Sequence, residues 1–182
     1  GGSDSVALTL LLKDVARHGG FEVVSLAHLN HRLRATAARD EAFCRELAER
    51  LGLPLAVDAA DVAGLAAAEG VSLERAARQA RYAFLRRAAA SVQADRIAVG
   101  HTRDDQAETI LHRIIRGTGL HGLRGMPVER PLAEGVTLIR PLLDCQRAAL
   151  RAGLVDLGQP WREDASNRDT SVGESDEEGY DL

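Results

Sequence analysis

The chain has 182 residues, of which 45% are hydrophobic and 27% are charged, a size and composition typical of one globular domain with its own core. No stretch approaches the roughly 18 consecutive apolar residues of a membrane-spanning helix, and no secretory leader opens the sequence, so we expect a cytoplasmic protein that contacts no membrane. Cys44 and Cys145 are the two cysteines, and their wide separation excludes a disulfide framework and a paired-cysteine metal or sulfur-handling site.

The acidic charge is concentrated at the C-terminal end. Five of the 27 acids lie in residues 173–182, which leaves 22 acids against 23 bases in residues 1–172. Every base except Lys13 is an arginine, a residue suited to bidentate contact with phosphate and to stacking on bases. An RNA partner would explain this bias, and so would the base composition of a genome. We expect the acidic, aperiodic residues 170–182 to be disordered.

The opening sequence GGSDS, residues 1–5, combines two glycines, two hydroxyls and an acid in front of an apolar helix predicted over residues 6–15. Glycine together with the N–H groups of a helix start can form a phosphate-binding site. Gly-Gly-Ser is also a common cloning linker, so this opening alone leaves both interpretations available.

Residues 21–28, FEVVSLAH, form an apolar run rich in β-formers, which predicts a strand. The polar, basic residues 29–34, LNHRLR, would then be a loop facing a ligand. His28 and His31 are candidates for that contact. The alternative is that one or both are ordinary polar turn residues, which is the more frequent case.

The next elements alternate in type. Residues 40–51 are predicted to form an amphipathic helix and residues 54–57 a short strand. This alternation indicates a parallel sheet with right-handed crossovers. Residues 73–92 predict a long helix on which Arg78 and Arg81 occupy neighbouring turns. The two arginines could point together at phosphate, or could belong to a solvated, salt-bridged face.

Residues 96–119, RIAVGHTRDDQAETILHRIIRGTG, contain the most informative pattern in the chain. A β-prone run at 97–99 precedes a helix predicted over 104–116 from the helical spacing of its apolar residues. Thr102 with Asp105 three residues later is a capping pattern at the start of this helix.

Polar side chains follow the short strand directly, namely His101, Asp104, Asp105 and Glu108. Open α/β sheets bind ligands at the carboxyl ends of their strands, so this position favours a functional site. Asp104 and Glu108 are four residues apart and share a helix face. The alternative is structural, because the helix dipole favours acids in a first turn whatever their function.

The remaining sequence contains a glycine-rich segment at 117–126, which must be mobile or must allow close approach to its backbone. A last short strand is predicted at 137–139. Asp144 is then expected to cap a helix extending to about Leu157.

Six segments occur in order along the chain: GGSDS, HLNHRLR, LERAARQARY, GHTRDDQAETILHRIIRGTGLHGLRGM, IRPLL and WREDASN. With these segments the chain resembles the tRNA(Ile)-lysidine synthetases of the PP-loop, or N-type ATP pyrophosphatase, superfamily. The opening matches the PP-loop pattern SGGxDS, and the central stretch matches HxxDDxxET. The resemblance covers residues 1–169, which we expect to be the catalytic domain without the first strand that precedes the PP-loop in that family.

The resemblance implies an α/β fold of the Rossmann-like nucleotide α-hydrolase type, a parallel twisted sheet with helices on both faces. It also implies ATP and Mg²⁺ as cofactors, and free L-lysine and the isoleucine tRNA with a CAU anticodon as partners. Lysine would be ligated to C2 of the wobble cytidine through an adenylated intermediate, giving lysidine, AMP and pyrophosphate. A tRNA thiolase of the same superfamily is the nearest alternative, but paired cysteines would be expected of it. An inactive nucleotide- or tRNA-binding fragment is another, and a homodimer remains open.

The matched motifs also imply roles for individual residues. The candidate catalytic residues are Asp4, His101, Asp104, Asp105, Glu108 and Arg81. The candidate nucleotide-binding residues are Gly1, Gly2, Ser3, Asp4, Ser5, His28, Arg78, Arg116 and Gly117. Asp4 and Asp105 are the candidate metal ligands, and the resemblance does not decide which acid would instead position lysine.

Overall fold

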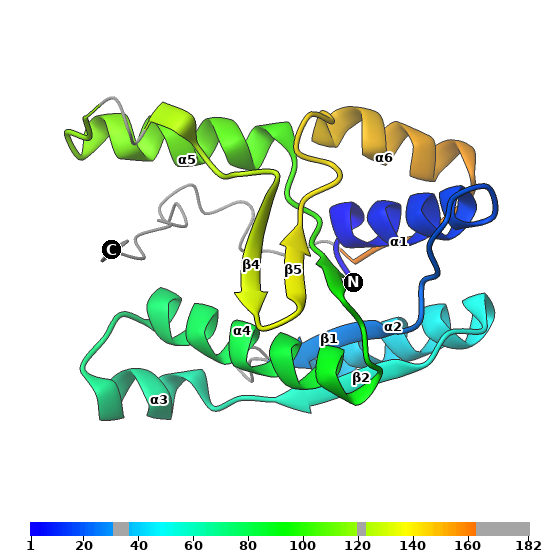
Figure 1. The fold of residues 1–182 in the computed structure, drawn as a ribbon, viewed down its shortest axis with the longest axis horizontal. Coiled ribbons are helices and arrows are strands. Elements are labelled where there is room, and N and C mark those ends of the chain that lie inside the picture. Colours follow the sequence, from blue (N-terminus) through cyan, green and yellow to red (C-terminus); the bar gives the residue numbers. More distant parts are fainter. Residues whose placement is uncertain (31–36, 120–122, 163–182) are drawn as a thin grey trace. The chain divides into compact units, whose positions relative to one another are not determined.

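A computed structural model describes residues 1–30, 37–119 and 123–162. Its elements are, in chain order, α1 (Ser3–Ala16), β1 (Leu26–Asn30), α2 (Ala37–Leu51), β2 (Leu55–Ala59), α3 (Val62–Glu69), α4 (Leu73–Ser91), β3 (Arg96–Ala98), α5 (Arg103–Ile115), β4 (Glu129–Ala133), β5 (Val136–Ile139) and α6 (Arg147–Asp156) (Figure 1). The alternation of strands and helices confirms the predicted α/β class. The segment HLNHRLR from His31 onward and the acidic tail lie outside the described residues, as does most of WREDASN.

The first sheet pairs β1 with β2 in parallel, in a register that runs from Leu26 opposite Leu55 to Asn30 opposite Ala59. The second sheet has the order β3-β5-β4. Thr137 N donates to Asp95 O at 2.9 Å and Val99 N donates to Ile139 O at 3.0 Å. These bonds advance in the same direction along both strands, as they do in a parallel pair.

Strand β4 was not predicted from the sequence. It contains Pro131, which has no N–H to donate, so such a residue is confined mostly to edge strands. β4 is indeed at the edge of its sheet. A tight turn connects it to β5, with Gly135 at a positive φ of 70°, and Figure 1 shows the two strands running in opposite directions.

The described chain forms two compact units. The first contains Gly1, Thr9–Ile97 and Pro131–Leu138, and the second contains Gly2–Leu8, Ala98–Arg130 and the chain from Ile139 onward. The chain passes from one unit to the other within α1, β3, β4 and β5.

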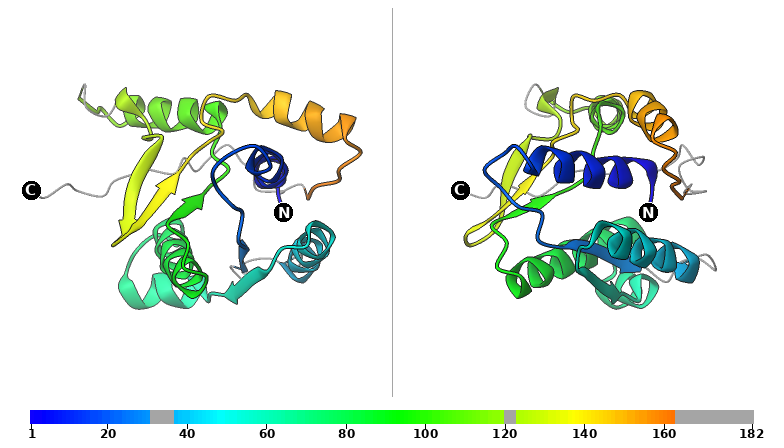
Figure 2. Two further views of the ribbon diagram at one scale, coloured as in Figure 1. Left: turned by 45° about the vertical axis from the view of Figure 1, so that its right-hand side comes forward. Right: turned by 90° about the vertical axis from the view of Figure 1, so that its right-hand side faces the viewer.

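In the first unit, helices α3 and α4 pack against each other through Val62, Ala66 and Ala76 (Figure 2). Both helices have an N-cap side chain, because Asp61 accepts from Gly64 N and Ser72 accepts from Arg75 N. These caps fix the starts of two helices, one of which carries the predicted arginines. Helix α4 confirms the helix predicted from residue 73.

In the second unit, the first turns of α1 bury Val6 and Leu8, and α6 buries Leu150 and Leu154. Helix α5 confirms the helix predicted in the central stretch, with its start one residue earlier. These helices carry the side chains of the candidate site.

Several predicted boundaries are wrong. Helices α1 and α2 each begin three residues earlier than predicted, at Ser3 instead of residue 6 and at Ala37 instead of residue 40. The strand predicted over 21–28 begins at Leu26, where Leu26 N first bonds Pro54 O at 2.8 Å, and it continues to Asn30. The apolar run at 21–28 therefore extends beyond the segment that pairs with β2. The last helix begins at Arg147 and its N-cap is Gln146, not the predicted Asp144. Cys145 N instead bonds Leu142 O at 2.8 Å, which places Asp144 in a turn.

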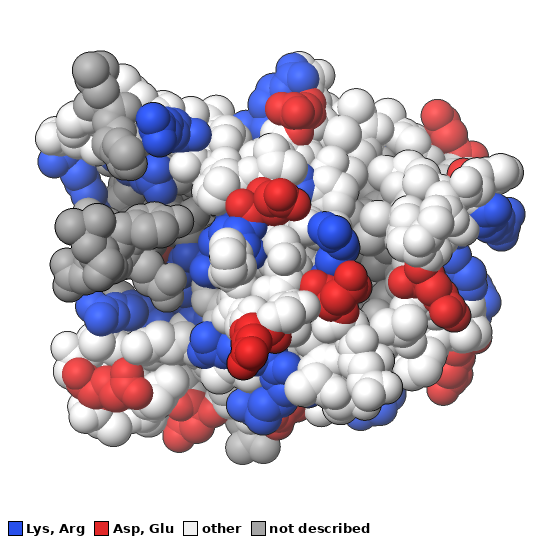
Figure 3. All heavy atoms as spheres, viewed as in Figure 1, with Lys and Arg blue, Asp and Glu red and all other residues white. Residues whose placement is uncertain are grey.

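The described acidic and basic side chains are interspersed on the face shown in Figure 3. Among the described helices, none is both long and apolar enough to cross a membrane.

Candidate active site

The candidate site is formed by the first residues of three helices, α1, α5 and α6. The start of α1 forms its first side. Val6 N donates to Gly2 O at 3.0 Å, which closes the first turn of the helix. The N–H groups that precede this bond have no carbonyl acceptor within the helix, so the helix start can receive an anion. Ser3 is buried and its hydroxyl donates to Asp4 Oδ1 at 3.0 Å. The sequence GGSDS thus forms a helix start with an oriented carboxylate.

Gly100 lies directly against this helix start. A Cβ atom at this position would lie 3.0 Å from the carbonyl carbon of Asp4 and 3.1 Å from the backbone nitrogen of Ser5. Both neighbours are backbone atoms, so a side chain here would displace the helix start. Glycine at position 100 allows the end of β3 and the start of α1 to approach each other.

The start of α5 forms the second side of the site. Thr102 has no exposed surface, and its backbone nitrogen and hydroxyl both donate to Asp105 Oδ2, at 2.6 and 2.7 Å. This geometry confirms the predicted capping box. The bonds occupy one oxygen of Asp105 and leave its other oxygen for a contact outside the helix.

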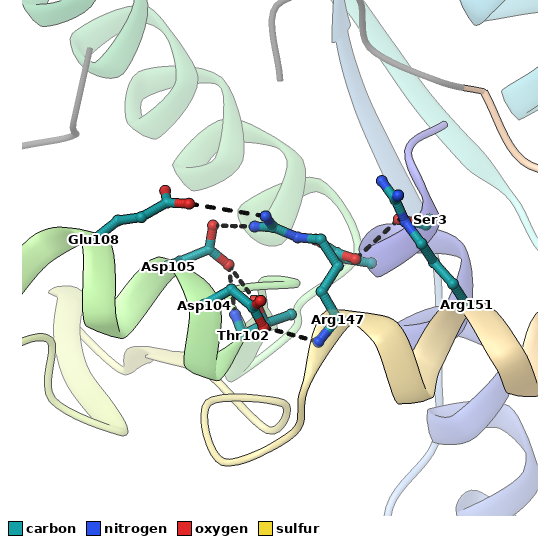
Figure 4. A network of polar contacts seen from close by, with 8 residues as sticks. Ser3, Thr102, Asp104, Asp105, Glu108, Arg147 and Arg151 are labelled. Carbon is teal, nitrogen blue, oxygen red and sulfur yellow. Dashed lines mark hydrogen bonds and ion pairs between the residues drawn. The ribbon is translucent and has the colours of Figure 1, made fainter. Parts of the chain in front are cut away.

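Arg147, the first residue of α6, contacts both the start of α1 and the start of α5 (Figure 4). Its Nε donates to Asp4 Oδ2 at 2.9 Å, and one terminal nitrogen donates to Asp105 Oδ1 at 2.6 Å. The other terminal nitrogen lies 3.9 Å from a carboxylate oxygen of Glu108. One guanidinium thus brings together acids from the opening of the chain and from the central stretch.

The charges around Arg147 favour its protonated form. Burial acts to lower the pKa of the guanidinium, but the charge of Asp105 and the hydrogen bond and charge of Asp4 raise that pKa by more, and the net direction is upward. Only 19% of the side chain is exposed, so solvent screens these pairs less than it would at the surface. Arg147 is therefore a fixed cation within the acidic cluster.

Asp104 has a structural contact in this arrangement. Its Oδ2 accepts a hydrogen bond from the backbone nitrogen of Arg147 at 2.8 Å, so it satisfies an N–H group at the start of α6. Next to it, Arg103 donates from its side chain to Asp144 O at 2.6 Å. These contacts attach the start of α5 to the start of α6. The predicted catalytic role of Asp104 remains a prediction.

His101 is held by a buried arginine. Arg140 is 1% exposed, and its Nε donates to His101 Nδ1 at 3.0 Å while a terminal nitrogen donates to Pro127 O at 2.7 Å. Because Nδ1 accepts this bond, the proton of the neutral ring is assigned to Nε2. A ring in this state can donate a hydrogen bond from Nε2.

Two other predicted residues lie away from the cluster. Arg116 is the C-cap of α5, and Gly117 follows with a positive φ of 80°. At about 1.5 Å per residue, Arg116 is roughly 18 Å along the helix axis from Asp104. The structure does not bring Arg116 and Gly117 together with the acids, and a contact of theirs with nucleotide or RNA remains a prediction.

The remaining predicted residues belong to the first unit, and their roles also remain predictions. Arg78 lies over the ring of Tyr82, with Cζ 5.0 Å from the ring centroid, and Arg81 is on the same helix. His28 lies in β1, where burial lowers its pKa.

The carboxylate oxygens of Asp4 and Asp105 are ligands of the kind that Mg²⁺ prefers. Mg²⁺ prefers oxygen ligands and is commonly held by one or two carboxylates together with substrate phosphates. Asp4 and Asp105 converge closely enough to contact one guanidinium. Within the described residues no three His, Cys, Asp or Glu side chains are arranged as metal ligands. The chain thus offers two carboxylates, and phosphate oxygens would have to complete the coordination.

Three arginines of the site were not predicted from the sequence, namely Arg140, Arg147 and Arg151. The Nε of Arg151 donates to Ser3 Oγ at 3.2 Å. Arg147 and Arg151 are one helical turn apart, so both face the start of α1. The spacing within RAALR is a usable signal of a shared face, but it does not indicate what that face contacts.

The features described so far define an α/β domain with one site at the starts of two helices. Glycines precede the first helix, α1, and acidic residues occupy the first turns of the second, α5. The model of the PP-loop domain family matches residues 1–173. The chain therefore belongs to the PP-loop domain family.

The chain is similar to several curated proteins named tRNA(Ile)-lysidine synthase. It is 46% identical over 173 residues to that of Thermus thermophilus, which covers 94% of this chain and 32% of the relative. It is 44% identical over 169 residues to that of Pseudomonas fluorescens, with 93% and 36% covered. For Rhodopirellula baltica the identity is 43% over 185 residues, with 93% and 47% covered. The chain thus spans a third to a half of the length of these relatives.

A solved structure has a similar fold. The U34-tRNA thiolase NcsA from Methanococcus maripaludis, determined with its [4Fe-4S] cluster, matches with a TM-score of 0.72 at 16% identity, covering 90% of this chain and 56% of the thiolase. At this identity the match shows the fold alone. It agrees with the predicted Rossmann-like class and gives the thiolase alternative no further support.

Proposed function

We propose that this domain is the catalytic part of a tRNA(Ile)-lysidine synthetase, which uses ATP to ligate free L-lysine to C2 of the wobble cytidine in the CAU anticodon of isoleucine tRNA. The observation that carries the proposal is the joining of Asp4 with Asp105 and Glu108 through Arg147. The similarity to relatives of that name supports it.

The activation step fits the start of α1. The cytidine O2 would attack the α-phosphorus of ATP, and pyrophosphate would leave with the electron pair of the broken P–O bond. The developing negative charge requires donors at fixed positions, which the helix-start N–H groups can supply. The Ser3 hydroxyl would join them by turning away from Asp4 Oδ1, to which it donates in the structure. Bound Mg²⁺ would neutralise phosphate charge, and Asp4 and Asp105 are the residues that would hold it.

The second step fits the acids of α5. The amine of lysine would attack C2 of the activated cytidine, and AMP would leave. An amine must lose a proton to complete this substitution, so a carboxylate within hydrogen-bond reach assists it. Glu108 suits this role, because its side chain is 66% exposed while those of Asp4 and Asp105 are 16% and 24% exposed. His101 would position the substrate through its Nε2 proton.

The substrate class also agrees with a site of this kind. A cytidine in an anticodon loop is single-stranded, so it can be turned into a pocket at modest cost. The paired cysteines expected of a sulfur-transferring enzyme are not present, since Cys44 and Cys145 are the two cysteines of the chain.

The test is the incorporation of labelled lysine into a CAU-anticodon isoleucine tRNA by the protein with ATP and Mg²⁺. We expect incorporation that requires all three components and that is lost when cytidine 34 of the tRNA is replaced. ATP hydrolysis to AMP in the presence of tRNA, without lysine incorporation, would refute lysine as the nucleophile. Sulfur incorporation would support the thiolase alternative instead.

A further inference from the structure

Arg147 was not among the residues that the sequence suggested, yet it makes the largest number of charged contacts in the site. Its side chain contacts Asp4, Asp105 and Glu108, and its backbone nitrogen contacts Asp104 (Figure 4). Four acids therefore surround the first residue of one helix. Without a cation among them, their mutual repulsion would destabilise this arrangement.

The two shortest charged contacts of Arg147 are to the oxygens that a bound cation would use. Asp4 Oδ1 is occupied by the Ser3 hydroxyl, and Asp105 Oδ2 by Thr102. The remaining oxygens, Asp4 Oδ2 and Asp105 Oδ1, are those that contact the guanidinium. A cation that binds both carboxylates through these oxygens would have to take the place of Arg147.

We propose that Arg147 is a resident counter-ion of the active site, which holds Asp4 and Asp105 together until a cation of the reaction displaces its guanidinium. The inference rests on the proposed function, because it concerns the carboxylates assigned there to Mg²⁺. Arg147 is a positioning residue in this scheme. It keeps the two carboxylates adjacent before the substrates bind, and it weakens cation binding in the absence of nucleotide.

A positively charged side chain released from the carboxylates would remain beside the start of α1. Arg151 is one turn further along α6 and already contacts Ser3 there at 3.2 Å. Arginine binds phosphate oxygens well, so the displaced guanidinium of Arg147 has an alternative partner when ATP is bound. This exchange would couple nucleotide binding to the release of the carboxylates.

The direct test is the affinity of the protein for Mn²⁺, a spectroscopic substitute for Mg²⁺, measured by electron paramagnetic resonance without ATP or tRNA. Arg147→Gln removes the competing charge and keeps a polar side chain. We expect it to bind Mn²⁺ roughly tenfold more tightly than the unmodified protein, or more. Arg147→Lys keeps the charge but loses the planar guanidinium whose separate nitrogens contact Asp4 and Asp105, and we expect an intermediate affinity.

Arg151→Gln is the matched control. It makes the same change one turn along the same helix, at a side chain that contacts a hydroxyl instead of the carboxylates, so we expect the Mn²⁺ affinity to change less than about threefold. Circular dichroism verifies that each variant is folded.

Equal or weaker Mn²⁺ binding by folded Arg147→Gln, relative to the unmodified protein, would overturn the inference. It would mean that Arg147 assembles the carboxylates without competing for them. The proposed function is tested separately, because lysine incorporation by the unmodified protein does not depend on the outcome for Arg147.

Discussion

At the scale of single residues, Asp105 and Asp104 both contact backbone at a helix start, and both are candidate catalytic residues. Asp105 uses one oxygen to cap α5 through Thr102 and the other to contact Arg147. Asp104 caps the start of α6. A loss of activity on mutation of either acid therefore has two explanations, and only a matched variant can separate them.

The two contacts of Asp105 can be distinguished by mutating Thr102. Asp105→Ala removes both the cap and the contact with Arg147, and we expect it to abolish AMP formation and to lower the free energy of unfolding by about 1–2 kcal/mol. Thr102→Val removes one hydrogen bond of the cap, for which we expect a stability loss of about 1 kcal/mol with activity retained. Urea denaturation and AMP release measure the two effects. An equal loss of activity in Thr102→Val would show that Asp105 acts through the helix cap alone.

The sequence identified the acids as candidates because their pattern is local, with four polar residues following a short strand. It could not predict Arg147, which contacts a residue 143 positions earlier. Asp144 was expected to be the N-cap of α6, which would have placed Arg147 in the first turn of that helix. Nothing in the sequence around it indicated that Arg147 connects the two motifs.

At the scale of elements, helices with strong caps and regular apolar spacing were predicted well, as α4 and α5 show. The strands were predicted less well. A strand's ends depend on its partner, so the run at 21–28 did not locate the start of β1. The charged and proline-containing β4 has no apolar alternation to identify it, and only its place at a sheet edge explains it.

The contact between Gly100 and the start of α1 leads to a prediction at this scale. Gly100→Ala would place a methyl group about 3 Å from the backbone of Asp4 and Ser5. We expect a stability loss of about 1–3 kcal/mol and weaker ATP binding, because the helix start must shift. Calorimetry of unfolding and of ATP binding measures both effects.

Gly153→Ala is a suitable control for this substitution. Gly153 lies within α6, and a Cβ there would meet nothing within 4 Å. Alanine is a better helix former than glycine, so we expect a gain in stability of about 0.5–1 kcal/mol with unchanged ATP binding. If Gly100→Ala behaved like this control, the close contact would not be a constraint on the site.

At the scale of the whole molecule, the alternation of elements predicted the α/β class, and the ordered motifs predicted membership of the PP-loop family. The division into two compact units was not predictable, because the chain crosses between them inside α1 and inside three strands. The acids of the site, with the start of α1, all belong to one unit. The predicted arginines of α4 and His28 belong to the other.

The most direct test of the central claim measures AMP and lysidine together, with ATP, Mg²⁺, labelled lysine and the CAU-anticodon tRNA. We compare the unmodified protein with Asp4→Asn, which keeps the shape of the side chain and removes its charge. We expect equal amounts of AMP and lysidine from the unmodified protein and neither product from the variant. Product formation at the unmodified rate by folded Asp4→Asn would contradict the claim that the opening of the chain and the acids of α5 serve one reaction.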